Sequence, residues 1–139
     1  MASLGLSVTT IERNEEMYKK AQENVKKYPF GSNIELVFSD ALEYTPLKEY
    51  DLIFIDAAKA QNIKFFERFT PFLKKGGIVV VDNLNFHGLT EKTEGLSKNL
   101  RSLVRKINEF KVYLKDRFDY DTTFTDQGDG MSLSIKLWF

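Results

Sequence analysis

The chain contains no cysteine, so it forms no disulfide bond, offers no thiolate to a metal and has no cysteine nucleophile. It has one histidine and only three prolines in 139 residues. No apolar run approaches the roughly 18 residues of a membrane-spanning helix, and the first residues lack the basic start of a signal peptide. The lack of cysteine suits a reducing compartment, so we expect a cytoplasmic protein with no membrane association.

The charges of the chain cancel. Twenty Lys and Arg residues balance twenty Asp and Glu residues, so the chain has no net positive charge with which to bind nucleic acid non-specifically. A local basic patch remains open, because four cations fall on one predicted helix: Lys98, Arg101, Arg105 and Lys106. Such a face is most often solvated, and the alternative is contact with a phosphate-bearing substrate. The length and the 42% hydrophobic content indicate one folded domain over residues 1–139.

Short apolar runs alternate with amphipathic stretches along the chain. Strands are predicted at 6–12, 34–38, 51–55 and 78–81, and helices at 14–28, 63–75 and 97–114. Asn14 and Ser97 are suited to cap the first and last of these helices, and Gly76–Gly77 to stop the middle one. A further helix after residue 40 is an alternative, and residues 84–95 are expected to form a loop.

The order of these elements predicts an α/β fold. The run 78–81 has no polar alternation, which is typical of a strand buried on both faces of a parallel sheet. Residues 120–124 and 131–137 alternate in polarity around a loop at 126–130, as in a β-hairpin. We therefore expect a mostly parallel sheet, with helices on both faces, that ends in an antiparallel hairpin.

An acidic residue follows each of four predicted strands. In open α/β sheets, ligands bind at the carboxyl ends of the strands, so these acids would share one edge. A helix cap or a turn explains any single acid equally well, but a ligand site better explains the whole set: Glu12, Asp40, Asp56 and Asp82. Glu12 stands where nucleotide-binding folds place the acceptor for ribose hydroxyls, and its alternative role is helix capping.

Two carboxylates and a carboxamide form the sharpest candidate site. Asp56, Asp82 and Asn83 offer hard oxygen ligands, which suit Mg²⁺, Mn²⁺ or Ca²⁺. Lys59 could act as a base if a nearby cation lowers its pKa; otherwise it is a solvated lysine at a helix start.

His87 is isolated and more typical of a surface or substrate-side residue than of a metal ligand. Gly128-Asp129-Gly130 precedes a strand, so we interpret it as a turn and not a phosphate loop.

Segments 8–24, 35–44 and 50–88, with the tail 119–136, resemble the cation-dependent class I O-methyltransferases. This group includes catechol and caffeoyl-CoA O-methyltransferases and small bacterial members, some of which methylate 5-hydroxyuridine in tRNA. The most specific motifs are the D-A-A-K run at 56–59 and the G-G-I-V-V-V-D-N run at 76–83. The resemblance implies a Rossmann-like methyltransferase sheet.

The resemblance also implies a role for each matching residue. Glu12 would bind the ribose of S-adenosylmethionine, Asp40 and Ala41 would flank its adenine, and Asp56 would contribute to the cofactor side as well. Asp56, Asp82 and Asn83 would hold Mg²⁺, and Lys59 would be the general base. The implied reaction is transfer of a methyl group to a hydroxyl of a catechol-like small molecule or of a tRNA hydroxyuridine.

The chain departs from this family at its N-terminal end. The family's N-terminal helices, first strand and glycine-rich turn should precede Leu6, and no such turn is present. We therefore expect an N-terminally truncated domain with an incomplete cofactor site and impaired methyl transfer, so enzymatic activity stays open. The rival hypothesis is a non-catalytic fragment that serves as an oligomerising scaffold, such as a strand-exchanged dimer. A receiver-like phosphate-transfer domain is disfavoured, because the sheet ends in a hairpin and no early strand ends in an acid pair.

Overall fold

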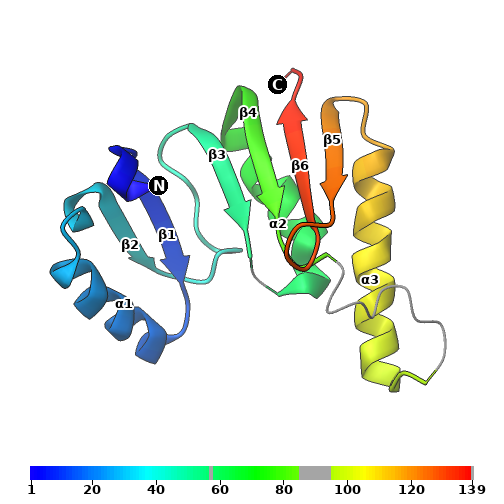
Figure 1. Ribbon diagram of the computed structural model, residues 1–139, viewed down its shortest axis with the longest axis horizontal. Coiled ribbons are helices and arrows are strands. Elements are labelled where there is room, and N and C mark those ends of the chain that lie inside the picture. The colour runs from blue at the N-terminus through cyan, green and yellow to red at the C-terminus, as the bar shows by residue number, and fades with distance from the viewer. Residues whose placement is uncertain (57, 85–94, 139) are drawn as a thin grey trace. The chain divides into compact units, whose positions relative to one another are not determined.

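A computed structural model describes residues 1–56, 58–84 and 95–138, except for the side chain of Lys59 (Figure 1). His87 and nearly all of the expected loop at 84–95 lie outside the described residues. The fold divides into two compact units, Met1–Thr45 and Pro46–Phe139, and each is described here by itself. The single domain expected over 1–139 stays a prediction.

The first unit is a β-α-β element. Strand β1 (Val8–Glu12) pairs in parallel with β2 (Ile34–Phe38), and helix α1 (Glu15–Lys27) connects them. The helix starts where the sequence predicts, because the Asn14 side chain accepts a hydrogen bond from the Met17 N–H at 3.0 Å. The alternative helix after residue 40 is absent, since residues 41–49 form turns and irregular backbone.

The second unit holds a four-stranded mixed sheet in the order β3-β4-β6-β5. Strand β3 pairs in parallel with β4, while β4 with β6 and β5 with β6 are antiparallel, which confirms the predicted C-terminal hairpin. The elements are β3 (Tyr50–Ile55), α2 (Asn62–Phe69), β4 (Leu73–Val81), α3 (Lys98–Lys115), β5 (Tyr120–Thr125) and β6 (Met131–Lys136). Ser97 caps α3 as predicted, by accepting from the Leu100 N–H at 3.2 Å.

The prediction for the end of the middle helix is wrong. Helix α2 ends at Phe69, a short 3₁₀ turn η4 (Thr70–Phe72) follows, and β4 begins at Leu73. Pro71 has no N–H to continue the α-helical hydrogen bonds, so the α-helix gives way to a 3₁₀ turn earlier than the glycine pair suggests. Gly76 has a φ of 80° inside β4, beside a shift in pairing register with β3. The run 74–77 therefore forms a strand that tolerates an irregularity.

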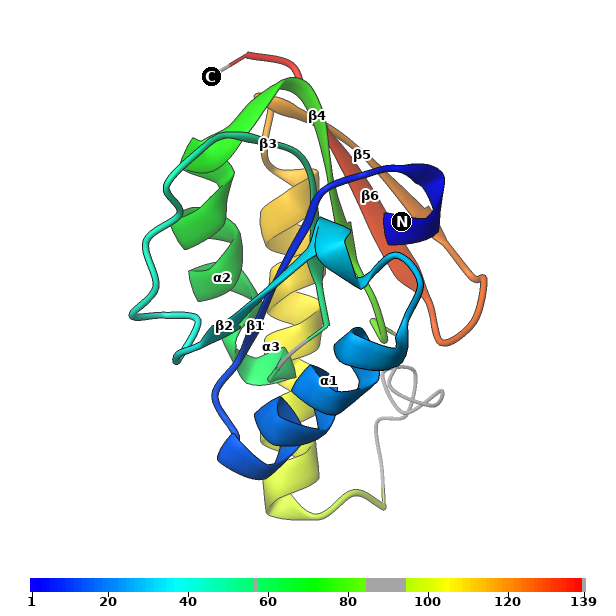
Figure 2. The ribbon, with the colours of Figure 1, turned by 90° about the vertical axis from the view of Figure 1, so that its left-hand side faces the viewer.

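Helices α2 and α3 pack on the same side of the four-stranded sheet (Figures 1 and 2). The Phe66 ring is fully buried there, 6.2 Å from the Phe110 ring and 5.1 Å from the Tyr120 ring between centroids. Large apolar side chains point the other way from β3 and β6 and stay exposed: Leu52, Phe54 and Ile135. Helices on both faces were expected, but the described helices of this unit cover one face only.

A buried lysine joins the last strand to the turn between α2 and β4. Lys136 is 4% exposed, and its Nζ donates to the backbone oxygens of Thr70 at 2.8 Å and Leu73 at 2.9 Å. These oxygens lie where α2 has ended and β4 has just begun, and the Thr70 oxygen also accepts from the Leu73 N–H. The two hydrogen bonds satisfy the buried Lys136 ammonium and hold β6 to this corner.

An arginine joins the end of α3 to the start of β5. The Arg117 guanidinium donates to both oxygens of Asp119, at 2.9 and 2.6 Å, and to the Tyr113 hydroxyl at 2.6 Å. It also lies over the Phe66 ring, 5.6 Å from the centroid. The hydrogen bond from Arg117 holds the pKa of Asp119 below its usual range, while burial raises the pKa of Tyr113 to about 12.

The ion pair between Arg117 and Asp119 should make a contribution to stability that is lost at acidic pH. Because the pKa of Asp119 is lower in the folded chain than its ordinary value of 3.8, the contribution is present above that value and is lost as the pH falls through the folded pKa. Urea unfolding at pH 6 and at pH 3 should show a smaller loss of stability in Asp119→Asn than in the parent. Asp121→Asn, at an exposed position on β5, is the control. Equal pH dependence in the parent and Asp119→Asn would contradict the prediction.

Candidate functional site

The second unit brings the three predicted metal ligands together at one edge of its sheet. Asp56 follows β3, and Asp82 and Asn83 follow the neighbouring parallel strand β4. The Asn83 side-chain nitrogen donates to an Asp56 carboxylate oxygen at 3.2 Å. The Asp82 N–H donates to the Ile55 backbone oxygen at 3.2 Å, which carries the pairing of β3 and β4 up to the site.

The backbone at Asn83 has an unusual conformation. Its φ is 61°, in the left-handed region that costs a non-glycine residue about 1 kcal/mol and that asparagine tolerates best. The Asn83 N–H donates to the Asp82 carboxylate at 2.7 Å, which supports this turn. The chain thus turns sharply after β4 and directs the Asn83 amide toward Asp56.

The donor set of this site fits a hard divalent cation. It combines two carboxylates with one amide, and the described residues contain no group of three or more Asp, Glu, His or Cys side chains placed to hold a metal. An ion here would therefore rely on Asp56, Asp82 and the Asn83 amide oxygen, with water or substrate completing the shell. The Asn83 amide must rotate to bind it, because its nitrogen faces Asp56 in this structure.

The first unit places two predicted cofactor residues at the carboxyl edge of its own sheet. A Glu12 carboxylate oxygen accepts from the Asn14 N–H at 2.9 Å in the turn that precedes α1, while Asn14 itself caps the helix. The Asp40 carboxylate accepts from the Leu42 N–H at 2.9 Å and lies 3.7 Å from the Arg13 guanidinium. A carboxylate has two oxygens, so the hydrogen bond from Asn14 leaves Glu12 capacity for a ribose hydroxyl. Ala41 is half-buried in the turn after Asp40.

The other candidates are less defined. The backbone of Lys59 starts the 3₁₀ turn η3 (Lys59–Gln61) just after Asp56, while its side chain lies outside the description. The predicted basic face lies on α3, where Lys98, Arg101, Arg105 and Lys106 are all exposed. The Arg105 side chain lies 3.7 Å from Glu109, so the charge of this face is partly compensated.

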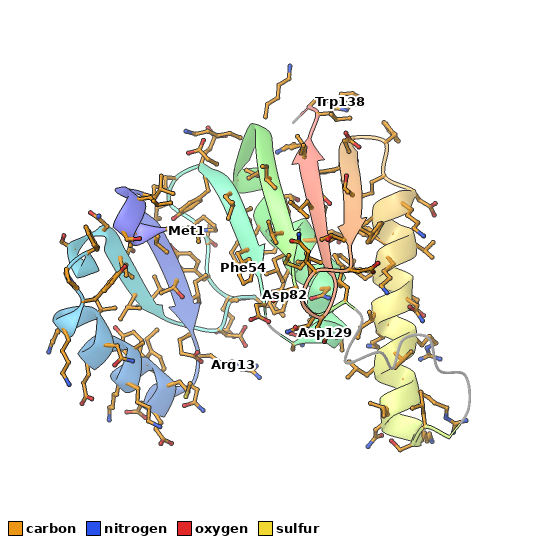
Figure 3. All side chains as sticks on the ribbon, viewed as in Figure 1. Met1, Arg13, Phe54, Asp82, Asp129 and Trp138 are labelled. Carbon is orange, nitrogen blue, oxygen red and sulfur yellow. The ribbon has the colours of Figure 1, made fainter. Side chains whose placement is uncertain are left out.

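Sequence reasoning overlooked one acidic residue near the site. Asp129 was assigned to a turn only, but Val81 pairs with Ser132, and the Leu84 N–H donates to the Gly130 oxygen at 3.0 Å. Figure 3 shows Asp82 and Asp129 at the same end of the four-stranded sheet. The predicted hairpin could have revealed this, because a strand antiparallel to β4 must begin at the carboxyl end of β4.

Acids at the carboxyl ends of parallel strands, together with a closing antiparallel hairpin, place the chain in the Rossmann-like α/β class. The O-methyltransferase family model matches residues 5–137. The chain belongs to that family.

Nearly the whole chain is similar in sequence and fold to known methyltransferases. A crystal structure from Staphylococcus aureus, provisionally named as a caffeoyl-CoA O-methyltransferase, is 42% identical with a TM-score of 0.87; the match covers 94% of this chain and 64% of that one. The caffeoyl-CoA O-methyltransferase of Stellaria longipes is 27% identical over 145 residues, which cover 94% of this chain and 58% of that protein. The methyltransferase of Podospora anserina with bound S-adenosylhomocysteine shares the fold at 24% identity and a TM-score of 0.79, and the match covers 94% of this chain and 60% of that one.

The chain therefore spans about three fifths of the length of these relatives. Among the described residues, no helix is both long and apolar enough to cross a membrane.

Proposed function

We propose that this chain is the core of an S-adenosylmethionine-dependent O-methyltransferase that uses a divalent cation, with Mg²⁺ as the first candidate. The acceptor would be a hydroxyl of a catechol-like small molecule or of a tRNA hydroxyuridine. The observation that carries this proposal is the meeting of Asp56, Asp82 and Asn83 at the ends of two adjacent parallel strands. Membership of the O-methyltransferase family supports it.

In this proposal residues at the ends of β1 and β2 serve the cofactor, and residues at the ends of β3 and β4 serve the cation. Glu12 would accept hydrogen bonds from the ribose hydroxyls of S-adenosylmethionine, and Asp40 and Ala41 would flank the adenine. Their position at the carboxyl edge of β1 and β2 supports this assignment. Asp56, Asp82 and Asn83 would hold the cation, and Asp56 is also a candidate cofactor ligand.

The reaction would be an in-line displacement at the methyl carbon. S-adenosylmethionine would supply the methyl group, with the electron pair of its broken carbon–sulfur bond left on sulfur as the carbon–oxygen bond forms, and Lys59 in its neutral form would accept the hydroxyl proton. A bound Mg²⁺ would supply Lewis acidity that lowers the pKa of the acceptor hydroxyl. The main contribution of the protein would be to hold the reacting atoms in line, which lowers the activation free energy by several kcal/mol.

Calorimetric titration with S-adenosylmethionine, in Mg²⁺ and in EDTA, tests the cofactor half. We expect measurable binding by the parent, weakened by the incomplete cofactor site, and about tenfold weaker binding by Glu12→Gln, because the hydrogen bond to ribose loses its charge. Glu15→Gln is the matched control, since Glu15 is a nearby exposed acid at the start of α1. No heat of binding from a folded chain would contradict the proposal, as would equal weakening by both variants.

The tRNA and small-molecule acceptors can be distinguished by salt. Binding of tRNA through the exposed cations of α3 should weaken steeply as salt rises, because counterions are released from phosphates. A shallow dependence of binding on salt would favour the small molecule.

The second candidate function is a homo-oligomeric scaffold, most simply a dimer. The exposed side chains of Leu52, Phe54 and Ile135 favour it, because they share the face of the sheet that the described helices leave open. Light scattering would show a dimer or larger assembly whose mass is unchanged by S-adenosylmethionine, and Phe54→Lys would dissociate it. A monomer at micromolar concentration would exclude this candidate.

A further inference from the structure

Beyond the proposed ligands, the hairpin loop between β5 and β6 lies against the same edge of the sheet. The antiparallel register of β4 and β6 ends with Val81 opposite Ser132. Past that pair, the Leu84 N–H donates to the Gly130 oxygen at 3.0 Å. This hydrogen bond therefore ties the chain segment that carries Asp82 and Asn83 to the hairpin loop, one residue after Asn83.

The loop is built to present one side chain in a fixed direction. The Gly130 N–H donates to the Gln127 oxygen at 3.1 Å, which closes a tight turn. Gly128 and Gly130 take positive φ values of 58° and 82°, so each of the two residues beside Asp129 has a conformation that favours glycine. Asp129 itself is half-buried, with one carboxylate oxygen shielded from solvent, whereas Asp126 in the same loop is exposed.

Asp129 is not a third carboxylate ligand of the candidate site. The described residues contain no group of three acidic, histidine or cysteine side chains arranged around one point. Asp129 lies at the same end of the sheet as Asp82 (Figure 3), and its neighbour Gly130 accepts from the Leu84 N–H just after Asn83, whose φ of 61° accompanies an amide that faces Asp56. A fixed negative group next to ligating residues both orients them and favours a cation.

We propose that Asp129, through the Gln127–Gly130 turn, is a positioning residue that holds the Asp82–Asn83 segment in its cation-binding conformation. The inference rests on the proposed function, because it presumes that Asp56, Asp82 and Asn83 bind a divalent cation. It adds a second element, the C-terminal hairpin, to a site otherwise formed by the ends of β3 and β4.

The test is Mn²⁺ affinity, measured by calorimetry and by the electron paramagnetic resonance signal of free Mn²⁺. Asp129→Asn should weaken Mn²⁺ binding by about tenfold or more, as loss of an outer partner of metal ligands typically does. Asp126→Asn removes the same charge from the same loop and should change the affinity less than about twofold. Gly128→Ala, whose new methyl group meets no atom within 4 Å, strains only the turn and should weaken binding by less than Asp129→Asn.

Thermal unfolding without metal separates positioning from folding. Retention of the parent melting temperature in Asp129→Asn, together with the loss of affinity, would support the proposal. Equal weakening by Asp126→Asn and Asp129→Asn would overturn it in favour of a general charge effect. Parent-like affinity in Asp129→Asn would also overturn it while leaving the proposed function intact, whereas failure of the parent to bind Mn²⁺ would refute both. If Asp129→Asn does not fold, Gly128→Ala decides: weakening of Mn²⁺ binding by more than about twofold would support the proposal, and parent-like affinity would overturn it.

Discussion

Asp82→Ala should weaken the binding of Mn²⁺ by at least about 100-fold, because it removes one of the two carboxylates that the described residues bring to the candidate site. The remaining donors, Asp56 and the Asn83 amide, cannot neutralise a divalent cation. Calorimetric titration of the parent and the variant measures this change directly. Asp126→Ala is the matched control, because it removes an exposed carboxylate from the hairpin loop of the same unit.

A second substitution separates the backbone of the site from its ligands. Asn83→Gly keeps the positive φ of 61° without strain but removes the amide oxygen, so we expect weaker binding with an unchanged melting temperature. Parent-like affinity in both Asp82→Ala and Asn83→Gly would refute the assignment of the metal ligands, whatever the effect on stability.

Phe66→Ala should lower the free energy of unfolding of the second unit by about 4 kcal/mol, the usual range for a large buried aromatic side chain. The Phe66 ring is fully buried and packs edge-on against the rings of Phe110, Tyr113 and Tyr120. Its removal would also take away the ring beneath the Arg117 guanidinium. Urea unfolding monitored by circular dichroism measures the change.

Phe118→Ala provides the contrast, because Phe118 is 80% exposed and should cost less than about 0.5 kcal/mol. Destabilisation below about 1.5 kcal/mol in Phe66→Ala would mean that the α2–α3 layer adjusts to fill the space, contrary to a closely packed core.

Local sequence signals predicted most of the elements because each reflects a local physical cause. The apolar run 78–81 is a strand of the parallel pair, and Asn14 and Ser97 cap helices, as their short polar side chains favour. The error at 74–77 arose where two local signals conflict. A basic, glycine-ended run is typical of a helix end, but Pro71 had already stopped the helix, and only pairing with β3 shows that the run is a strand.

The candidate site was predictable where it depends on strand ends and not where it depends on tertiary contacts. Asp56, Asp82 and Asn83 come together because β3 and β4 are parallel neighbours, which the element order implies. Glu12 braces the turn before α1 by accepting from the Asn14 N–H, while Asn14 caps the helix, a division of roles that the sequence pattern does not reveal. The pairing of Arg117 with Asp119 and the placement of Asp129 depend on the geometry of the hairpin, which composition and periodicity do not reveal.

The position of β6 also affects how the second unit is made. This strand follows the other described strands in sequence, yet it lies between β4 and β5, and Lys136 at its end completes the corner after α2. A ribosome delivers β6 after β4 and β5, so these two strands have no partner between them until residues 131–136 emerge. We expect the four-stranded sheet to form in one step only after these residues have emerged, with β4 exposed on one edge until then.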